Sequence, residues 1–254
     1  MNLYYEMLRQ PVFNIRDVLK FYDNIETARS ALKKLLRDGL AVRIRNEMYT
    51  CISGETGSPV ANRYQIASAV TPSAYLSHHS AMELYGVADQ VFYDVYVSSD
   101  TKFSPFRFDG YTYNFLKSAC DSGIEDVVYG GGIRVTDKER TVIDCIKDMD
   151  AISGTEETLA NIAAISGLSE EKLLIYLEHY SNRFLYQKTG FILSLHQERL
   201  ELSDAFFSEC RGRIGKSKRY FTKDEPSGKY DRIWHIIVPE NIMTLKNGGT
   251  YDFV

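Results

Sequence analysis

The sequence has 254 residues, which is long enough for one large domain or two ordinary ones. It is 44% apolar, 25% charged and 13% aromatic, a composition typical of a globular protein and not of a disordered or fibrous one. The net charge of −4 is unevenly distributed. Residues 1–50 contain nine Lys and Arg against six Asp and Glu, whereas residues 51–254 contain 21 against 28. This asymmetry indicates a basic head that binds an acidic partner.

The cysteines and the N-terminal segment bear on the cellular compartment. Four cysteines are widely spaced, without a C-x-x-C pair or a metal-binding spacing, which is typical of reduced thiols in a cytosolic protein. The first residues, "MNLYYEMLRQ", are charged within six positions and so do not resemble a signal peptide. No apolar run approaches the ~20 residues that a membrane-spanning helix requires. We therefore expect a cytoplasmic protein with no membrane partner.

Three helices are predicted within the first forty residues. The segments "NLYYEMLRQ" and "NIRDVLKFY" show helical spacing, and Asn14 is a suitable N-cap for the second. The third helix begins after Asp23-Asn24 and ends before Gly39, the residue expected after a helix C-terminus. Its apolar stripe consists of Ile25, Ala28, Leu32, Leu35 and Leu36.

A small β-hairpin follows at once. Leu40, Val42 and Ile44 alternate with Ala41, Arg43 and Arg45, and "EMYTCI" returns after a turn at residues 45–47. This alternation predicts that Arg43 and Arg45 both face outward. Three helices and a hairpin over residues 1–53 predict a winged helix-turn-helix domain, with the third helix in the major groove and the hairpin as the wing.

The side chains on these elements suit DNA recognition. Arg29 can bind a guanine edge through two hydrogen bonds, and the Thr27 and Ser30 hydroxyls can reach a base or a phosphate. The lysines and the hairpin arginines suit phosphate neutralisation. For any one of these residues a solvated surface is the simpler interpretation, and a winged helix can also bind protein. The whole set nevertheless favours double-stranded DNA, contacted by Thr27, Arg29, Ser30, Lys33, Lys34, Arg43 and Arg45.

The rest of the chain predicts a second, larger domain. The Gly-, Ser- and Pro-containing segment 53–63 reads as a linker crossed by few contacts, so we expect the second domain over residues 60–254. The predicted fold class is α+β: the winged helix, then a mixed α/β domain in which strands precede a helical stack. We expect helices at 62–70, 73–85, 137–149, 156–166, 169–180, 184–202 and 203–210, and strands at 90–99, on both sides of Asp109-Gly110 and of Gly130–Gly132, and at 218–223 and 230–239.

No stretch meets the requirements of a catalytic, metal or cofactor site. Residues 212–217, "GRIGKS", resemble a phosphate loop, but the required earlier glycine is Cys210 and no apolar strand precedes it. His78 and His79 are adjacent and so point about 100° apart on a helix. His79 and Glu83 share a face, but two ligands do not form a metal site. We therefore predict a protein with no catalytic activity and no cofactor.

One further basic segment, residues 211–223, contains no acidic residue although the surrounding part of the chain is acidic. It reads equally well as a second contact with DNA phosphates and as a solvated loop. Its members are Arg211, Arg213, Lys216, Lys218 and Arg219, followed by Lys223.

Several segments resemble one known family. "SAYLSHHSAMELYGV", "VYV" and "GIRVTDKERTVIDCI", with "TGFILSLHQERLEL" and "DRIWHIIVP" later, resemble the body of AbiEi-like antitoxins, the repressor halves of type IV toxin–antitoxin pairs in abortive infection. The sharpest element, "VTDKERTVIDC", is similar to the family's TD-x-ERT-x-x-D segment. The antitoxin-domain signature here is Thr136, Asp137, Glu139, Arg140, Thr141 and Asp144.

The resemblance implies a specific function. Such proteins repress their own operon by binding inverted repeats in the promoter, which suits a dimer on DNA. They also neutralise a genetically linked nucleotidyltransferase-like toxin without forming a stable complex. Two alternatives stay open: a nucleotide- or ligand-sensing protein or enzyme with an accessory winged helix, and a stand-alone regulator that lacks a toxin.

Overall fold

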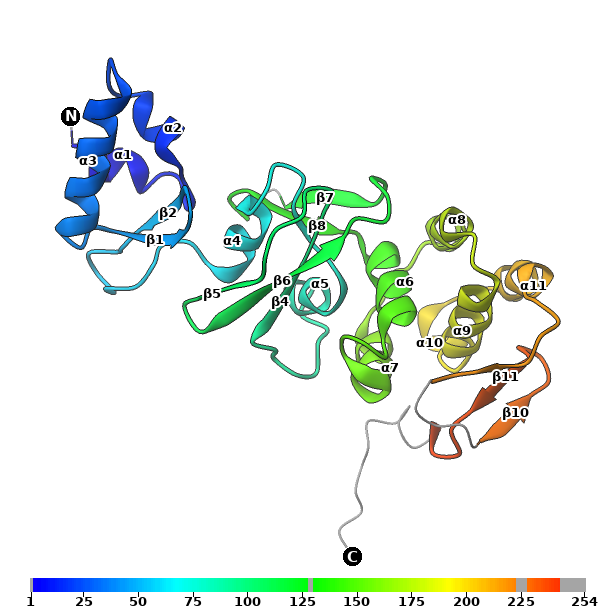
Figure 1. Cartoon of the computed structure of the whole chain (residues 1–254). Coiled ribbons are helices and arrows are strands. Elements are labelled where there is room, and N and C mark those ends of the chain that lie inside the picture. Colours follow the sequence, from blue (N-terminus) through cyan, green and yellow to red (C-terminus); the bar gives the residue numbers. More distant parts are fainter. Residues whose placement is uncertain (1, 128–129, 223–227, 243–254) are drawn as a thin grey trace, which may run out of the picture. The chain divides into compact units, whose positions relative to one another are not determined.

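A computed structural model describes residues 2–127, 130–222 and 228–242. The chain forms two compact units, and it passes between them several times. The first comprises residues 1–76, 93–118 and 124–135, and the second comprises residues 77–92, 119–123 and 136–254. Within these described ranges, helices and three separate sheets make the fold mixed α/β (Figure 1). No helix within the described residues is both long enough and apolar enough to cross a membrane.

The three predicted N-terminal helices are present. They are α1 (Leu3–Met7), α2 (Ile15–Leu19) and α3 (Ile25–Arg37). The Asn14 side chain accepts a hydrogen bond from Arg16 N (2.7 Å), and that of Asn24 accepts one from Thr27 N (2.9 Å). Both asparagines therefore cap helices as expected. Gly39 follows α3 with φ +69°, a conformation that glycine adopts without strain.

The hairpin after α3 differs from the expected alternation. Strands β1 (Ala41–Arg45) and β2 (Met48–Cys51) pair antiparallel, with a register shift between Arg43 and Arg45. Because of this irregularity, Ala41 and Ile44 are both buried while Leu40 is exposed. The prediction that Leu40, Val42 and Ile44 share the inner face is therefore wrong. Figure 1 shows the three helices grouped above this hairpin.

The expected linker lies within the first unit and is an ordered turn. Ser53 N donates to Ser58 O, and Val60 N donates to Cys51 O, both at 2.9 Å. The Tyr4 hydroxyl donates to Ile52 O at 2.7 Å, which ties α1 to the same segment. The Gly, Ser and Pro residues thus close a turn through local hydrogen bonds. A domain boundary between residues 53 and 60 stays a prediction.

A six-stranded sheet makes up most of the remaining first unit. Its order is β5-β6-β4-β3-β8-β7, and α4 (Arg63–Ala69) packs on β3 and β4. The strands are β3 (Tyr75–Leu76), β4 (Asp94–Ser99), β5 (Phe106–Phe108), β6 (Tyr111–Lys117), β7 (Ile124–Val127) and β8 (Ile133–Thr136). The β5–β6 turn is confirmed, with positive φ at both Asp109 and Gly110.

Two boundaries in this region were predicted wrongly. Residues 73–85 are not one helix, because Tyr75–Leu76 forms a buried strand paired with both β4 and β8. The helix α5 (His78–Leu84) begins only after that strand. Strand β4 starts at Asp94 and not at residue 90, and Val91 and Tyr93 before it are about 70% exposed.

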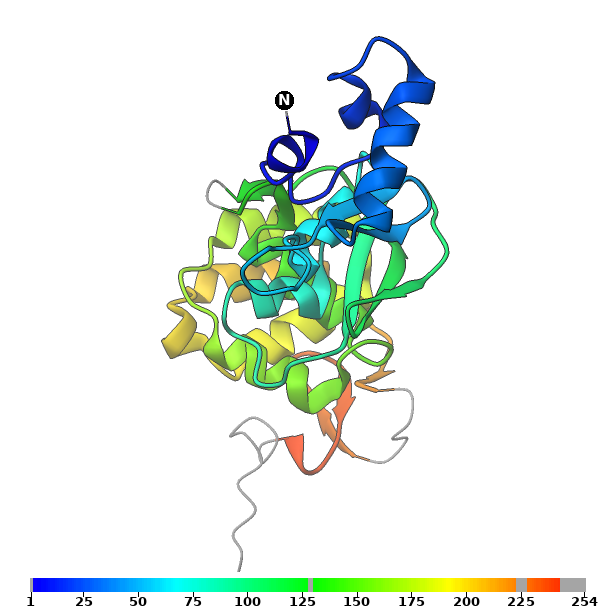
Figure 2. The same ribbon diagram turned by 90° about the vertical axis from the view of Figure 1, so that its left-hand side faces the viewer.

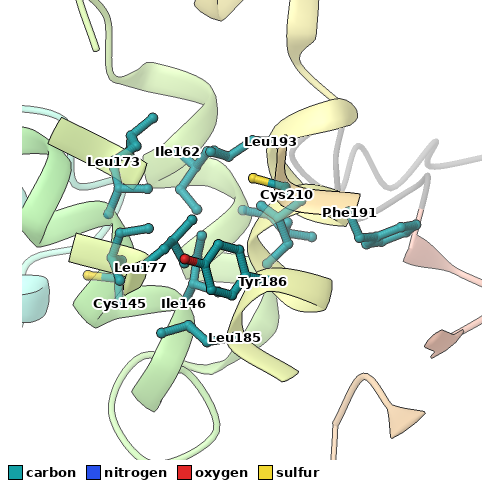
Figure 3. Close-up of a cluster of buried hydrophobic side chains, with 14 of the residues drawn as sticks. Cys145, Ile146, Ile162, Leu173, Leu177, Leu185, Tyr186, Phe191, Leu193 and Cys210 are labelled. Atoms are coloured by element: carbon teal, nitrogen blue, oxygen red, sulfur yellow. The ribbon is translucent and has the colours of Figure 1, made fainter. Parts of the chain in front are cut away.

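The second unit is largely helical. After α5 it contains α6 (Lys138–Asp148), α7 (Gly154–Ala164), α8 (Glu170–Tyr180), α9 (Arg183–Ser194), α10 (Gln197–Leu200) and α11 (Asp204–Arg213), followed by β9 (Arg219–Tyr220), β10 (Lys229–Asp231) and β11 (Ile236–Val238). Figure 3 shows part of its core, a cluster of buried side chains to which α6 contributes Cys145 and Ile146, α8 Leu177, α9 Leu185 and α11 Cys210.

Two predicted elements of this unit are divided. The helix expected over 184–202 is interrupted at residues 195–196, so α9 and α10 are separate. The strand expected over 230–239 is a hairpin of β10 and β11 with a turn at 232–235, and His235 there has φ +52°. Lys223, the last residue of the predicted strand 218–223, lies outside the described residues.

Candidate functional site

The outer face of α3 carries most of the predicted DNA contacts. Ala28, Leu32 and Leu35 are buried on the inner side, in the core shared with α1 and α2. The opposite side chains are all exposed, and Figure 2 shows α3 on the near side of the N-terminal helices. They are Thr27, Arg29, Ser30, Lys33, Lys34 and Arg37. Because residues 30, 33, 34 and 37 recur at helical spacing, they form one surface.

Three members of this face already have local partners, and one of them, Arg37, donates from Nε to Asp38 Oδ1 at 3.2 Å. The Thr27 hydroxyl lies 3.0 Å from the Asn24 side-chain oxygen, so it supports the cap of α3. The Arg29 guanidinium donates to Glu26 Oε1 at 2.7 Å, in an ion pair whose side chains are both more than half exposed. Such an exposed pair contributes at most about 1 kcal/mol, so a phosphate or a guanine edge competes readily for Arg29.

The two hairpin arginines lie in different environments. Arg43 is exposed, and its guanidinium donates to Arg45 O (3.1 Å) and to Asn46 Oδ1 (2.7 Å) across the turn. Arg45 is half-buried, with its guanidinium carbon 5.7 Å from the Phe103 ring centre and 5.1 Å from that of Phe106. Among the described residues, its buried Nη1 has no hydrogen-bond partner.

This packing corrects the prediction for Arg45. The register shift in β1 turns its side chain toward the loop and strand that hold the two phenylalanines, where the cation–π attraction replaces contact with water. Arg45 therefore does not share the outward face with Arg43. Sequence periodicity missed this contact because Phe103 and Phe106 lie almost sixty residues later in the chain.

The second basic segment lines a cavity in the second unit. All five predicted members are exposed, but they differ in their contacts. Arg213 is paired with Glu209 (3.0 Å) and Glu178 (3.4 Å), whereas Lys218 Nζ lies 4.8 Å from the Tyr230 ring centre. A cavity of about 620 Å³ is lined by Arg213, Lys216 and Arg219, together with residues from the start of α9.

The six residues of the predicted antitoxin-domain signature form a buried polar cluster at the start of α6. All six of its residues are buried. Asp137 caps the helix by accepting from Arg140 N (2.8 Å), and its second oxygen accepts from Tyr176 (2.6 Å) and Lys172 (3.1 Å) of α8. The Thr136 and Thr141 hydroxyls lie 2.7 Å apart. Glu139 accepts from Ser169 N at 2.7 Å.

Arg140 is the centre of this cluster. It donates from Nε to both Asp144 oxygens (2.9 and 3.0 Å) and from Nη1 to Ser122 O (2.9 Å). The Tyr180 hydroxyl also donates to Asp144. The i,i+4 spacing of Arg140 and Asp144 predicts an intrahelical ion pair, and the structure contains it with only 1% of Arg140 exposed. The pair therefore joins α6, α8 and segment 119–123. Because it is buried, loss of either partner would leave an uncompensated charge inside the fold.

The charges in this cluster are mutually stabilised. Burial lowers the pKa of Arg140, but the Asp144 carboxylate more than offsets that effect and the net shift is upward. Burial, together with Asp144, raises the pKa of Tyr180. Both shifts favour the protonated forms of Arg140 and Tyr180. Hydrogen bonds from the cluster link α6 to α8 and to segment 119–123, which suits a structural role.

Comparison with known proteins identifies no family. No protein-family model matches the sequence, and no curated protein matches it. Among solved structures, the crystal structure of the RV2827C protein from Mycobacterium tuberculosis is similar, with a TM-score of 0.65 and 14% sequence identity. The match covers 97% of this chain and 92% of that chain. At this identity it establishes a shared fold over nearly the whole length, and nothing more.

Proposed function

We propose that this protein is a DNA-binding transcriptional repressor with a winged helix-turn-helix at residues 1–53. The observation that carries the proposal is the exposed surface of α3, which presents Ser30, Lys33, Lys34 and Arg37 on one face and follows two shorter capped helices. A hairpin with an exposed arginine, Arg43, follows directly, as a wing would. The basic charge of residues 1–50 gives the long-range attraction that DNA binding requires.

The experiment compares two variants with the same loss of charge. One is the full chain with Lys33→Ala and Lys34→Ala. The other carries Arg9→Ala and Lys20→Ala, which remove exposed cations that lie just after α1 and α2. Binding to the DNA upstream of the protein's own gene is measured by fluorescence anisotropy over a range of salt concentrations. We expect the Lys33/Lys34 variant to lose about two units of salt slope, and the other to lose almost none.

Two results would contradict the proposal. If the unaltered protein binds its own promoter no more tightly than unrelated DNA, the proposed repressor function is wrong. Equal losses in the two variants would mean that general charge, and not the α3 face, is responsible.

The same proposal assigns the remaining residues, 60–254, to neutralisation of a nucleotidyltransferase-like toxin encoded by a neighbouring gene. The support is the TD-x-ERT-x-x-D segment, and the toxin would be neutralised without a stable complex. The test is growth of cells that express this toxin beside the full chain or beside a variant with Lys33, Lys34 and Arg43 replaced by Glu. We expect rescue by both and repression only by the first. If neither the full chain nor the variant restores growth, the protein is a regulator without an antitoxin role.

A further inference from the structure

The cavity beside the second basic segment has the composition of a site for an anionic small molecule. It is lined by Arg183 and Phe184 at the start of α9, and on the opposite side by Arg213 at the end of α11, Lys216 in the loop and Arg219 in β9. None of the described residues that line it is acidic. Its volume of about 620 Å³ falls within the range of small-molecule sites.

Three of the four cations are available to a ligand. Arg213 is held by Glu178 and Glu209, but within the described residues Arg183, Lys216 and Arg219 form no ion pair. Arg183 lies beside the loop, since a Cβ added to Gly215 would sit 3.9 Å from its Cδ. Arg183 is also the first residue of a twelve-residue helix, whose dipole adds positive potential at that end.

The loop that carries these cations is held in place from within. The buried Gln187 side chain donates to Ser217 O (3.3 Å) and to Trp234 O (3.1 Å). His235 Nδ1 lies 3.1 Å from Gly215 O, and Arg219 N donates to His235 O. The loop backbone is therefore fixed while its charged side chains stay exposed. Ligand binding would then cost little conformational entropy of the loop backbone.

We infer that this cavity binds an organic phosphate of mononucleotide size. Arg183, Lys216 and Arg219 supply charge-assisted hydrogen bonds to phosphate oxygens, and arginine matches their geometry with two donors. The half-buried Phe184 and Ile214, which line the same cavity, supply apolar surface for a base. A concave site of this size suits a small molecule better than a DNA backbone. The inference does not depend on DNA binding by α3.

The test measures binding of ADP, adenosine and pyrophosphate to the full chain by calorimetry, together with the shift in melting temperature. We expect saturable ADP binding, weaker binding of pyrophosphate and none of adenosine. Arg183→Ala and Lys216→Ala should each weaken ADP binding about tenfold. Lys218→Ala is the matched control: it removes the same charge from the same loop, outside the cavity lining, and should change the affinity less than twofold.

Three outcomes would overturn the inference. One is the absence of saturable binding of ADP or pyrophosphate at millimolar concentration. Another is an equal loss in Lys218→Ala, which would mean that overall charge alone attracts the ligand. The third is a result in which Arg183→Ala and Lys216→Ala weaken the binding of duplex DNA but not of ADP. That result would make the segment a second contact with DNA. Circular dichroism melts of each variant verify that the exposed substitutions leave the fold intact.

Discussion

Helices α3 and α6 are both rich in charged residues, but they use them in opposite ways. On α3 the polar side chains are exposed, and their partners lie within three or four residues, as for Arg29 with Glu26. On α6 four polar side chains are buried, and they also have partners in α8 and in segment 119–123, as for Arg140 with Ser122. A polar surface that the fold does not use is available to a partner, whereas a polar cluster that joins elements is committed to stability.

The largest expected effect comes from breaking the buried pair. Arg140→Ala should lower the free energy of unfolding by about 3–5 kcal/mol, because it leaves the Asp144 carboxylate buried without its cation. The measurement is urea denaturation followed by circular dichroism.

The matched control is another i,i+4 pair, Glu209 with Arg213 on α11, whose side chains are 50% and 45% exposed. Arg213→Ala should cost less than about 1 kcal/mol. Replacing both members of the buried pair, Arg140→Met with Asp144→Leu, should recover part of the loss, since no unpaired charge remains. Equal costs for Arg140→Ala and Arg213→Ala would mean that burial does not distinguish the two pairs.

A smaller difference should separate the two hairpin arginines. Arg45→Ala should lower the free energy of unfolding by about 1–2 kcal/mol, because the guanidinium stacks on Phe103 and Phe106. Arg43→Ala should change it by less than about 0.5 kcal/mol, because its partners are exposed and local. Similar thermal and urea unfolding curves for the two variants would contradict the packing of Arg45.

On α3 the expected effect concerns DNA affinity and leaves stability nearly unchanged. If the proposed function holds, Arg29→Ala should weaken the discrimination between bases at one position of the operator. It should also reduce the free energy of DNA binding by about 1–3 kcal/mol. Lys33→Ala should weaken binding to all sequences alike and reduce the salt slope by about one unit. Binding assays on a set of operator variants measure both quantities. If the two substitutions have the same effect, Arg29 does not read bases.

Some elements of the fold can be predicted from the sequence and others cannot. The caps at Asn14 and Asn24 were found because a helix N-terminus depends on residues within one turn. Strand Tyr75–Leu76 was missed, since two residues are too few for a periodic pattern and its state depends on β4 and β8. Strand Ile133–Thr136 and the hairpin of Phe106–Phe108 with Tyr111–Lys117 are longer, and the sequence predicts them correctly.

The sites follow the same rule. Spacing identified Arg140 with Asp144, but not the tyrosine and the loop about 20 to 40 residues away that bury them. The segment 212–217 lacks the phosphate-loop spacing, which describes a strand and a helix joined in sequence. Its cations instead meet Arg183, thirty residues earlier, and only the fold brings them together.

The smallest perturbation tests burial through the cysteines. Burial raises the pKa of the Cys51 thiol to about 11. It is also the largest cause of the raised pKa of Cys210, which is about 12, and of the raised pKa of Cys145. These three thiols are buried and stay protonated at pH 8, so they should resist iodoacetamide in the native protein. Cys120, at the edge of the Arg140 cluster, is partly exposed and should be alkylated alone. Mass spectrometry after brief labelling gives the pattern, and labelling in urea, where all four should react, is the control. Comparable native reactivity at Cys51, Cys145 or Cys210 would mean that the cores of these units open far more readily than their packing indicates.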